Sequence, residues 1–189
     1  MKVDRLQVLK LWNDCHLLGP RQDFIKKTCD RLFSYKELFY EPVEKSLGIP
    51  WYLIGALDYR ESSFDHKAYL GNGDPLNKKT VHVPRGRGPF KNWHEGAIDA
   101  LVLDGINKLP EGGHWDIVTV LIKAEGYNGF GYRARGLPSP YVWGGTTIQR
   151  AGKYVADGKF DQNAWDTQLG CAALFLGLRT FYGVNLRED

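Results

Sequence analysis

Glu61 is the residue of this chain whose position most clearly suggests chemistry. It lies near the end of residues 50–64, whose pattern predicts a short helix. Positions three, four and seven apart share one side of a helix, so Ile54, Leu57 and Glu61 are expected on one face. A carboxylate on an apolar face loses hydration, which raises its pKa, and the helix dipole acts in the same direction. Such a carboxyl group is suited to protonate a glycosidic oxygen near neutral pH.

A structural interpretation of Glu61 stands beside the chemical one. Charged residues are mostly exposed, and a Glu at a frayed helix end often points into water. The segment alone does not decide between the two, so both interpretations stay open.

The segment after Glu61 is rich in turn and strand signals. Gly71-Asn72-Gly73-Asp74-Pro75 is typical of a turn, and it separates residues 66–70 from residues 79–84, which have the composition of short strands. The pattern predicts a small β-hairpin directly after the Glu61 helix. Five basic residues surround it and would attract an anionic polymer: Lys78, Lys79, Arg85, Arg87 and Lys91.

The rest of the chain has mainly helical periodicity. The apolar spacing predicts helices near residues 6–19, 24–33, 38–47, 93–109, 115–126, 141–155 and 164–182. The chain has 189 residues, of which 43% are hydrophobic and 25% charged, as is ordinary for a globular protein. We therefore predict a mainly α (α+β) fold in a single domain covering residues 1–189.

Composition limits the classes of partner and cofactor. The net charge of +3 is far from the strongly basic balance of a dedicated nucleic-acid binder. Cys15, Cys29 and Cys171 are few, odd in number and widely spaced, so we expect neither a disulfide framework nor a zinc site. The five histidines lack the spacing of a helical metal site, and we expect no metal and no cofactor.

Several runs of the sequence resemble lysozyme-family muramidases of bacteria and phages (endolysins), within the lysozyme-like superfamily. The resemblance covers roughly residues 45–175. The runs that carry it are Arg60-Glu61-Ser62-Ser63-Phe64, Asn72-Gly73-Asp74-Pro75-Leu76, Thr80-Val81-His82-Val83-Pro84, Glu125-Gly126-Tyr127-Asn128-Gly129, Ser139-Pro140-Tyr141-Val142-Trp143 and residues 152–158. It implies a lysozyme-like helical domain that cleaves the β-1,4 bond between N-acetylmuramic acid and N-acetylglucosamine in peptidoglycan.

The resemblance also implies catalytic roles for three residues. Glu61 takes the role of the general acid, while Asp74 and Thr80, six positions apart, would hold the water that attacks the anomeric carbon. The gap of thirteen positions between Glu61 and Asp74 is longer than in phage lysozymes of this type. The alternative is that Asp74 bonds its own turn and that Thr80 is a strand residue.

Aromatic residues in the second half are candidates for contact with sugar rings. Tyr127 and Asn128 close an apolar helix and would meet one saccharide, although a helix C-cap explains them too. Tyr132, Tyr141 and Trp143 are further candidate sugar platforms, with core packing as their alternative role. Glu125 is a rival acid, for which a solvated position in the last helical turn is the alternative.

Other functions stay open beside the muramidase. Lytic transglycosylases share the Glu-Ser and Tyr-Asn features and form anhydro-sugars, although the Gly-Leu-Met-Gln type motif that usually follows their Glu is absent. A chitinase-like glycosidase, or a non-catalytic saccharide-binding or virion structural protein, would use the same scaffold. No signal peptide or membrane-spanning run is seen, so we expect a monomer that stays cytoplasmic until release and acts on the cell wall, with peptidoglycan strands as its partner.

Overall fold

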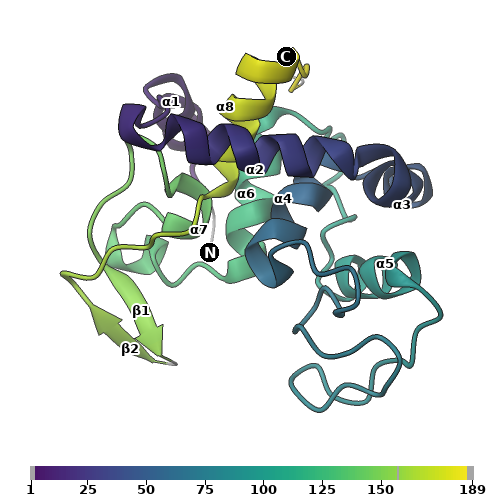
Figure 1. Ribbon diagram of the computed structural model, residues 1–189. Coiled ribbons are helices and arrows are strands. Elements are labelled where there is room, and N and C mark those ends of the chain that lie inside the picture. Colours follow the sequence, from purple (N-terminus) through teal and green to yellow (C-terminus); the bar gives the residue numbers. More distant parts are fainter. Residues whose placement is uncertain (1–2, 157, 187–189) are drawn as a thin grey trace. The chain divides into compact units, whose positions relative to one another are not determined.

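Helices dominate the computed structural model of this protein (Figure 1), which describes residues 3–156 and 158–186. Within these residues the chain forms eight α-helices and one two-stranded antiparallel hairpin. The chain divides into two compact units. We call Arg31–Trp115 the central unit, and Met1–Asp30 with Asp116–Asp189 the terminal unit. The mainly helical class predicted from the sequence is confirmed.

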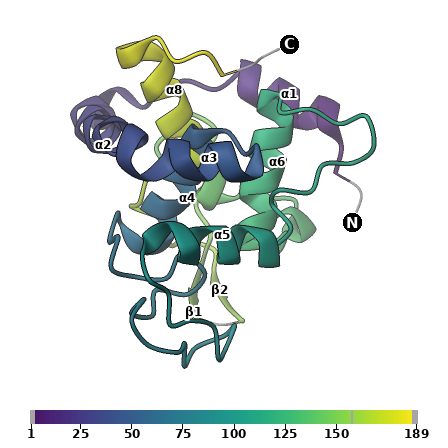
Figure 2. The ribbon, with the colours of Figure 1, turned by 90° about the vertical axis from the view of Figure 1, so that its right-hand side faces the viewer.

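The central unit contains three complete helices and one π-helical turn. The π-helical turn spans Lys36–Tyr40 and leads directly into α3 (Glu41–Leu47). Next come α4 (Trp51–Ser62) and, after a long loop, α5 (Trp93–Leu103). Figure 2 shows α5 below α3, and the two helices are in contact.

The terminal unit is built around α6 (Ile117–Asn128) and α8 (Cys171–Tyr182). Helix α1 (Arg5–Asn13) packs on α6, and the short helix α7 (Pro140–Trp143) contacts both α6 and α8. Helix α2 (Gln22–Ser34) crosses the boundary between the units. The remaining elements are two 3-10 turns, Gly19–Arg21 and Arg133–Arg135, and the strands β1 (Lys153–Ala156) and β2 (Lys159–Asp161).

Helix α4 is the core element of the central unit. Its first nine residues, Trp51 to Tyr59, are all buried, so the helix is covered on every side and not on one stripe. Gly55 permits this close packing, because a Cβ atom there would lie 2.9 Å from the Tyr40 ring and 3.0 Å from Leu32. The scaffold that ends in Glu61 is therefore held from all directions.

Gly177 has the same role for α8 in the terminal unit. A Cβ atom at this position would lie 2.6 Å from Cys29 Sγ and 2.9 Å from Ile25. Both neighbours lie on α2 and are fully buried, so they have little room to move.

We expect Gly177→Ala to lower the free energy of unfolding by about 1–3 kcal/mol, the usual cost of overpacking a core. The control is Gly19→Ala, because a Cβ atom at Gly19 has nothing within 4 Å. That change should stay within about 0.5 kcal/mol of wild type. Denaturant unfolding of both variants measures the difference, and equal stabilities would contradict the close approach of α8 to α2.

The hairpin lies elsewhere than the sequence pattern predicted. Residues 66–70 and 79–84 form no strands, and the region retains one isolated bridge, between Ala68 and Pro75. Side chains and turn bonds take up its backbone groups instead, and Val81 and Val83 remain exposed. The observed hairpin, β1–β2, occupies part of the region where a helix over 141–155 was expected. That helix stops at Trp143, because Gly144 and Gly145 follow and Gly145 adopts a φ of 82°.

Candidate functional site

Glu61 lies in the last turn of α4 and its side chain is exposed. The expected apolar face does not bury it. Ile54 and Leu57 are buried because this part of α4 is covered on all sides. Their burial therefore does not depend on the face that they share with Glu61. Burial ends at Tyr59, and the last turn emerges from the core. The prediction from the sequence pattern that the chain buries Glu61 is therefore wrong.

A buried carboxylate, Asp58, organises the turn that carries Glu61. Its side chain is fully buried and receives three hydrogen bonds. The hydroxyl of Tyr40 donates at 2.9 Å, the hydroxyl of Ser62 donates at 2.6 Å, and Nε2 of His66 lies 2.9 Å away. Asp58 thus connects α4 to the π-helical turn and to the loop after the helix.

The three partners of Asp58 behave as donors. Burial, followed by the negative charge of Asp58, raises the pKa of Tyr40 far above its usual range, so its phenol keeps its proton. A carboxylate only accepts hydrogen bonds, so the Nε2 atom of His66 carries the proton in this pair. The sequence pattern missed this cluster, whose one local signal is Asp58 within an apolar helix with Ser62 four residues later.

The chain turns sharply after Ser62. Ser63 and Phe64 both have left-handed backbone conformations, with φ of 55° and 66°. A bulky residue seldom adopts this conformation, which costs about 1–3 kcal/mol per residue. Packing of Phe64 offsets the cost, because its buried ring lies 5.3 Å from the ring of Tyr59 and 5.8 Å from that of Tyr35. A strained turn held by packing directly after a candidate catalytic residue is typical of a functional site.

Asp74 uses its carboxylate to organise the loop. Its Oδ2 atom accepts hydrogen bonds from the backbone N–H groups of Val81 and His82, at 2.8 and 3.0 Å. Nδ1 of His82 lies 2.6 Å from the other oxygen. The side chain is buried, so these contacts account for Asp74 as a turn residue without a substrate.

Thr80 is bonded within the same loop. Its hydroxyl donates to the carbonyl of Pro84 at 2.6 Å and accepts from the backbone N–H of Arg87 at 3.0 Å. Like Asp74 it is buried, and both side chains therefore have structural partners. Glu61, Asp74 and Thr80 all belong to the central unit.

Acid should weaken the contribution of Asp74 to stability. Hydrogen bonds from the backbone and imidazole of His82, and from the backbone of Val81, hold the pKa of Asp74 below its usual 3.8. A carboxyl group with a lowered folded-state pKa stabilises the fold above its unfolded pKa, and this contribution disappears as pH falls through the folded value. The stability difference between wild type and Asp74→Asn should therefore be constant at neutral pH and shrink below pH 3.8. Denaturant titrations over this range measure it, and a difference independent of pH would contradict the hydrogen-bonded carboxylate.

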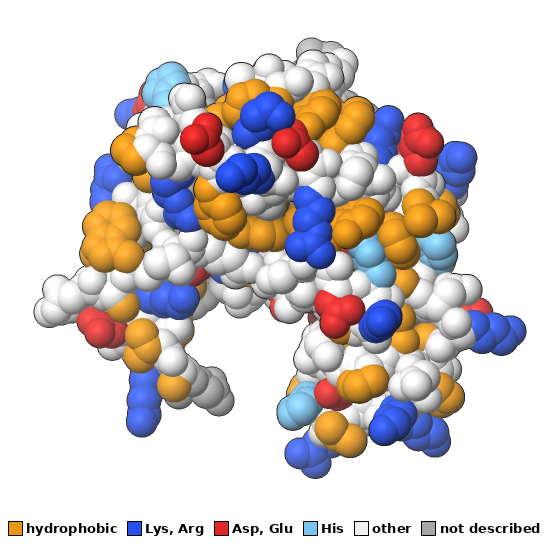
Figure 3. Space-filling model, in the orientation of Figure 1, with side chains coloured by type: hydrophobic (Ala, Val, Ile, Leu, Met, Phe, Trp, Pro, Cys, Tyr) orange, Lys and Arg blue, Asp and Glu red, His pale blue; other side chains and the backbone are white. Residues whose placement is uncertain are grey.

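An aromatic groove lies in the central unit beside the Asp58 cluster. Its cavity has a volume of about 640 Å³. Eleven residues line it and define the groove: Phe39, His66, Lys67, Pro75, Leu76, Asn77, Phe90, Lys91, Asn92, Trp93 and His94. On the face drawn in Figure 3, histidine side chains lie among hydrophobic ones at the right, over the central unit. The sequence had indicated Lys91 as part of a basic cluster, and Pro75 and Leu76 as part of a motif, but it did not predict an aromatic groove.

The candidate sugar-contacting residues all lie in the terminal unit, and they differ in exposure. Tyr127 is half-buried and Asn128 is exposed at the end of α6, where Gly129 follows with a φ of 86°. Tyr132, Tyr141 and Trp143 are buried. Their ring faces are therefore not open to a saccharide, and packing accounts for these three residues.

Tyr132 illustrates this packing role. Its hydroxyl accepts a hydrogen bond from the backbone N–H of Tyr154 at 3.1 Å, and its ring meets the Tyr154 ring edge-on at 5.2 Å. Tyr132 therefore anchors β1 of the hairpin to the chain after α6.

Glu125 is buried, contrary to the solvated position that the sequence suggested. Its carboxylate is ion-paired with the guanidinium of Arg133. Both residues line a cavity of about 380 Å³ in the terminal unit, together with Arg150. The carboxylate of Glu125 is therefore engaged in a structural ion pair within the terminal unit.

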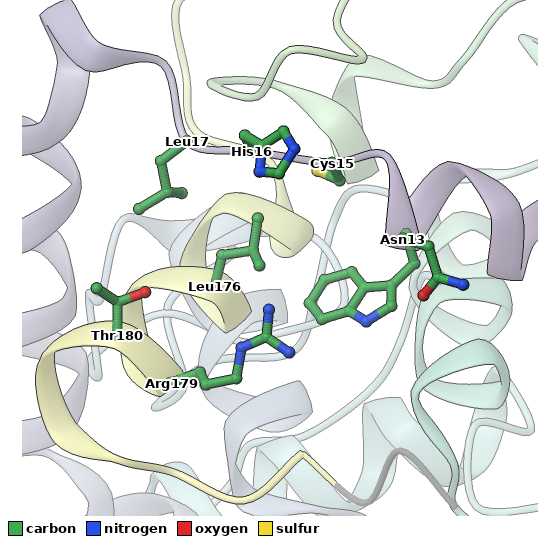
Figure 4. A pocket seen from close by; sticks show the side chains of 8 residues that line it. Asn13, Cys15, His16, Leu17, Leu176, Arg179 and Thr180 are labelled. Carbon is green, nitrogen blue, oxygen red and sulfur yellow. The ribbon is translucent and has the colours of Figure 1, made fainter.

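A second pocket of the terminal unit places Cys15 and His16 near Arg179, which reaches in from α8 (Figure 4). The pocket has a volume of about 310 Å³. A cysteine beside a histidine is a common nucleophile pair. Burial, however, raises the pKa of the Cys15 thiol to about 11, so the thiol stays protonated at neutral pH. We assign this pocket no nucleophile.

Comparisons with known proteins found no match. No protein-family model, no curated protein and no solved structure matches the chain. Among the described residues, no group of three or more His, Cys, Asp or Glu side chains could hold a metal ion. None of the helices in the described part of the chain is long and apolar enough to cross a membrane.

Proposed function

We propose that this protein is a glycosidase that cleaves the β-1,4 bond of peptidoglycan between N-acetylmuramic acid and N-acetylglucosamine, with Glu61 as the general acid. The observation that carries the proposal is that Glu61 is exposed at the end of a helix whose other residues are mostly buried. Nine consecutive buried residues, Trp51 to Tyr59, anchor α4, and Glu61 in its last turn is exposed. An acid on a rigid element is held in position for proton transfer.

The Asp58 cluster adds to this positioning. Ser62, the residue after Glu61, donates to both the carboxylate and the carbonyl of Asp58, at 2.6 and 3.0 Å. His66 joins the same carboxylate from beyond the strained turn. The turn that carries Glu61 is thereby fixed on both sides. A bound glycan would cover the exposed carboxylate and remove its water, which favours the protonated form when the reaction needs it.

The charge of the loop after α4 suits an anionic wall polymer. Lys78, Lys79 and Arg85 are exposed, and Figure 3 shows Lys and Arg side chains on this part of the surface. Arg87 differs from them, because its guanidinium is ion-paired with Asp99. Exposed cations raise the rate at which an anionic substrate is captured.

Lytic transglycosylation is the second candidate function. The occupied carboxylate of Asp74 favours it, because an inverting hydrolase needs a second carboxylate free to hold the attacking water. A transglycosylase uses one acid and closes the muramic acid on itself, with no attacking water. In that case Glu61 keeps its role as acid, and Asp74 and Thr80 remain loop residues.

A paired assay on two substrates tests the proposed function. Purified peptidoglycan and soluble chitin are incubated with the protein, and new glycan ends are followed over time. We expect cleavage of peptidoglycan and little or none of chitin. Cleavage of chitin alone would replace the proposal by a chitinase, and binding of either polymer without cleavage would replace it by a non-catalytic saccharide-binding protein.

A further inference from the structure

We propose that the aromatic groove of the central unit binds an acidic amino sugar, namely a muramyl peptide that carries a free carboxylate. The choice of this ligand rests on the proposed function, because such peptides hang from the glycan that Glu61 would cleave. The sequence motifs did not predict this groove. Its aromatic floor and its positive charge are the features that indicate the kind of ligand.

The floor of the groove is a rigid set of rings. Phe39 and His66 stack with their ring centroids 3.6 Å apart and an angle of 11° between the planes. Trp93 stands edge-on to both rings, with centroids at 5.7 and 5.2 Å. On another wall Phe90 stacks on Tyr69 at 5.1 Å. Ring faces of this kind pack against the apolar face of a sugar.

His66 is fixed by more than stacking. Its Nε2 atom is bonded to the buried carboxylate of Asp58, so the ring cannot rotate away without breaking that bond. His94 is fixed in the same manner, because its Nε2 atom lies 2.9 Å from the carbonyl oxygen of Leu38. A site whose rings are held before the ligand arrives loses less entropy on binding.

The charge of the lining is of one sign. Lys67 and Lys91 are the charged residues that line the groove beside its two histidines, and both are exposed. Among residues 3–156 and 158–186, neither ammonium group forms an ion pair. No Asp or Glu belongs to the lining. Two unpaired cations at the edge of an apolar floor complement a ligand with a ring and a carboxylate.

The neighbouring pocket on α5 shows the contrast. It includes Glu95 and Asp99, and its cation, Arg87, is already paired with Asp99. The lining of that pocket has two carboxylates and one cation, so its net charge is negative and does not suit an acidic ligand. The aromatic groove combines an apolar floor with positive charge, and we therefore choose it.

Binding measurements on catalytically silent protein test this inference apart from the function. Glu61→Gln protein is titrated with a muramyl dipeptide that has a free carboxylate, with the amide of the same dipeptide, and with a neutral N-acetylglucosamine oligomer. Backbone amide chemical shifts report where each ligand binds. We expect the acidic dipeptide to bind most tightly and to shift the amide signals of residues 91–94.

Two double variants remove the same number of positive charges, one pair inside the groove and one pair outside it. Lys67→Gln with Lys91→Gln removes the two cations of the groove, whereas Lys45→Gln with Lys108→Gln removes two exposed cations of the central unit that do not line it. The first pair should weaken binding of the acidic dipeptide about tenfold, in line with the loss of two surface ion pairs. The second pair should change it about twofold or less.

Each other outcome overturns the inference. Equal affinity for the acid and the amide, stronger binding of the neutral oligomer, or equal effects of the two double variants would remove the acidic amino sugar from the groove. If the dipeptide does not bind but wild type cleaves peptidoglycan, only the assignment of the groove fails. If wild type does not cleave peptidoglycan but the dipeptide binds in the groove, only the proposed function fails. The two proposals therefore fail separately.

Discussion

Replacement of Glu61 by Gln is expected to lower the rate of peptidoglycan cleavage at least about 100-fold, the lower end of what a general acid contributes. Gln keeps the shape of the side chain and has no proton to transfer. Because Glu61 is exposed and outside the core, the fold should be unaffected. The measurement is the initial rate of release of new glycan ends, with thermal unfolding of both proteins followed in parallel.

Glu111→Gln is the matched control for this prediction. Glu111 is also an exposed carboxylate of the central unit, and it lies in the loop after α5. This variant should cleave at the wild-type rate, because it changes net charge equally and leaves α4 untouched. Equal activity of Glu61→Gln and Glu111→Gln would remove Glu61 from the reaction.

Removal of the Asp58 carboxylate is expected to have the largest effect on stability. In Asp58→Ala the buried hydroxyl of Tyr40 loses its acceptor, and His66 and Ser62 lose theirs. Breaking a buried charged cluster by removing one member costs about 3–5 kcal/mol. That is a large share of the about 5–15 kcal/mol that stabilises an ordinary domain. The free energy of unfolding in denaturant measures this loss.

Two further variants separate the parts of this effect. Asp58→Asn keeps one oxygen as acceptor, so its loss should be smaller than that of Asp58→Ala. Ser62→Ala removes one half-buried hydroxyl, which donates to Asp58 and accepts from the backbone N–H of Asp65. It should cost about 1–2 kcal/mol, because each hydrogen bond is worth about 0.5–1.5 kcal/mol. If Asp58→Ala were as stable as Ser62→Ala, Asp58 would not be the centre of the cluster.

Sequence periodicity identified the helices that are rich in apolar residues. Helices α5, α6 and α8 all lie within or close to the predicted ranges, because a run of buried apolar side chains leaves a clear pattern. The predicted ends of these helices were less accurate. The segment predicted as helix up to Leu109 ends at Leu103, before Gly105 adopts a φ of 63°.

Residues 66–84 were predicted wrongly for an identifiable reason. β-branched residues and a turn sequence indicated two strands, but the turn residue Asp74 bonds the backbone of Val81 and His82. This side chain replaces the strand-to-strand hydrogen bonds of a hairpin. Local composition does not show whether a backbone group will be bonded by a neighbouring strand or by a carboxylate seven residues away.

Glu61 and Asp58 show the limit of the pattern for the candidate site. Both are carboxylates in one helix, three positions apart, yet Asp58 is buried and Glu61 is exposed. The sequence directed attention to Glu61, and the partners of Asp58 became visible only with the fold. Tyr40 lies eighteen positions before Asp58 and His66 eight after it, so no local spacing links the three.

Mass spectrometry of the fragments released from purified peptidoglycan tests the central claim most directly. Wild type should release muropeptides cut between N-acetylmuramic acid and N-acetylglucosamine, and Glu61→Gln should release almost none. A reducing muramic acid end would identify a hydrolase, and an anhydro end, lighter by one water, would identify a transglycosylase. Fragments cut only in the peptide cross-links, or the same glycan fragments from Glu61→Gln at the wild-type rate, would contradict the account.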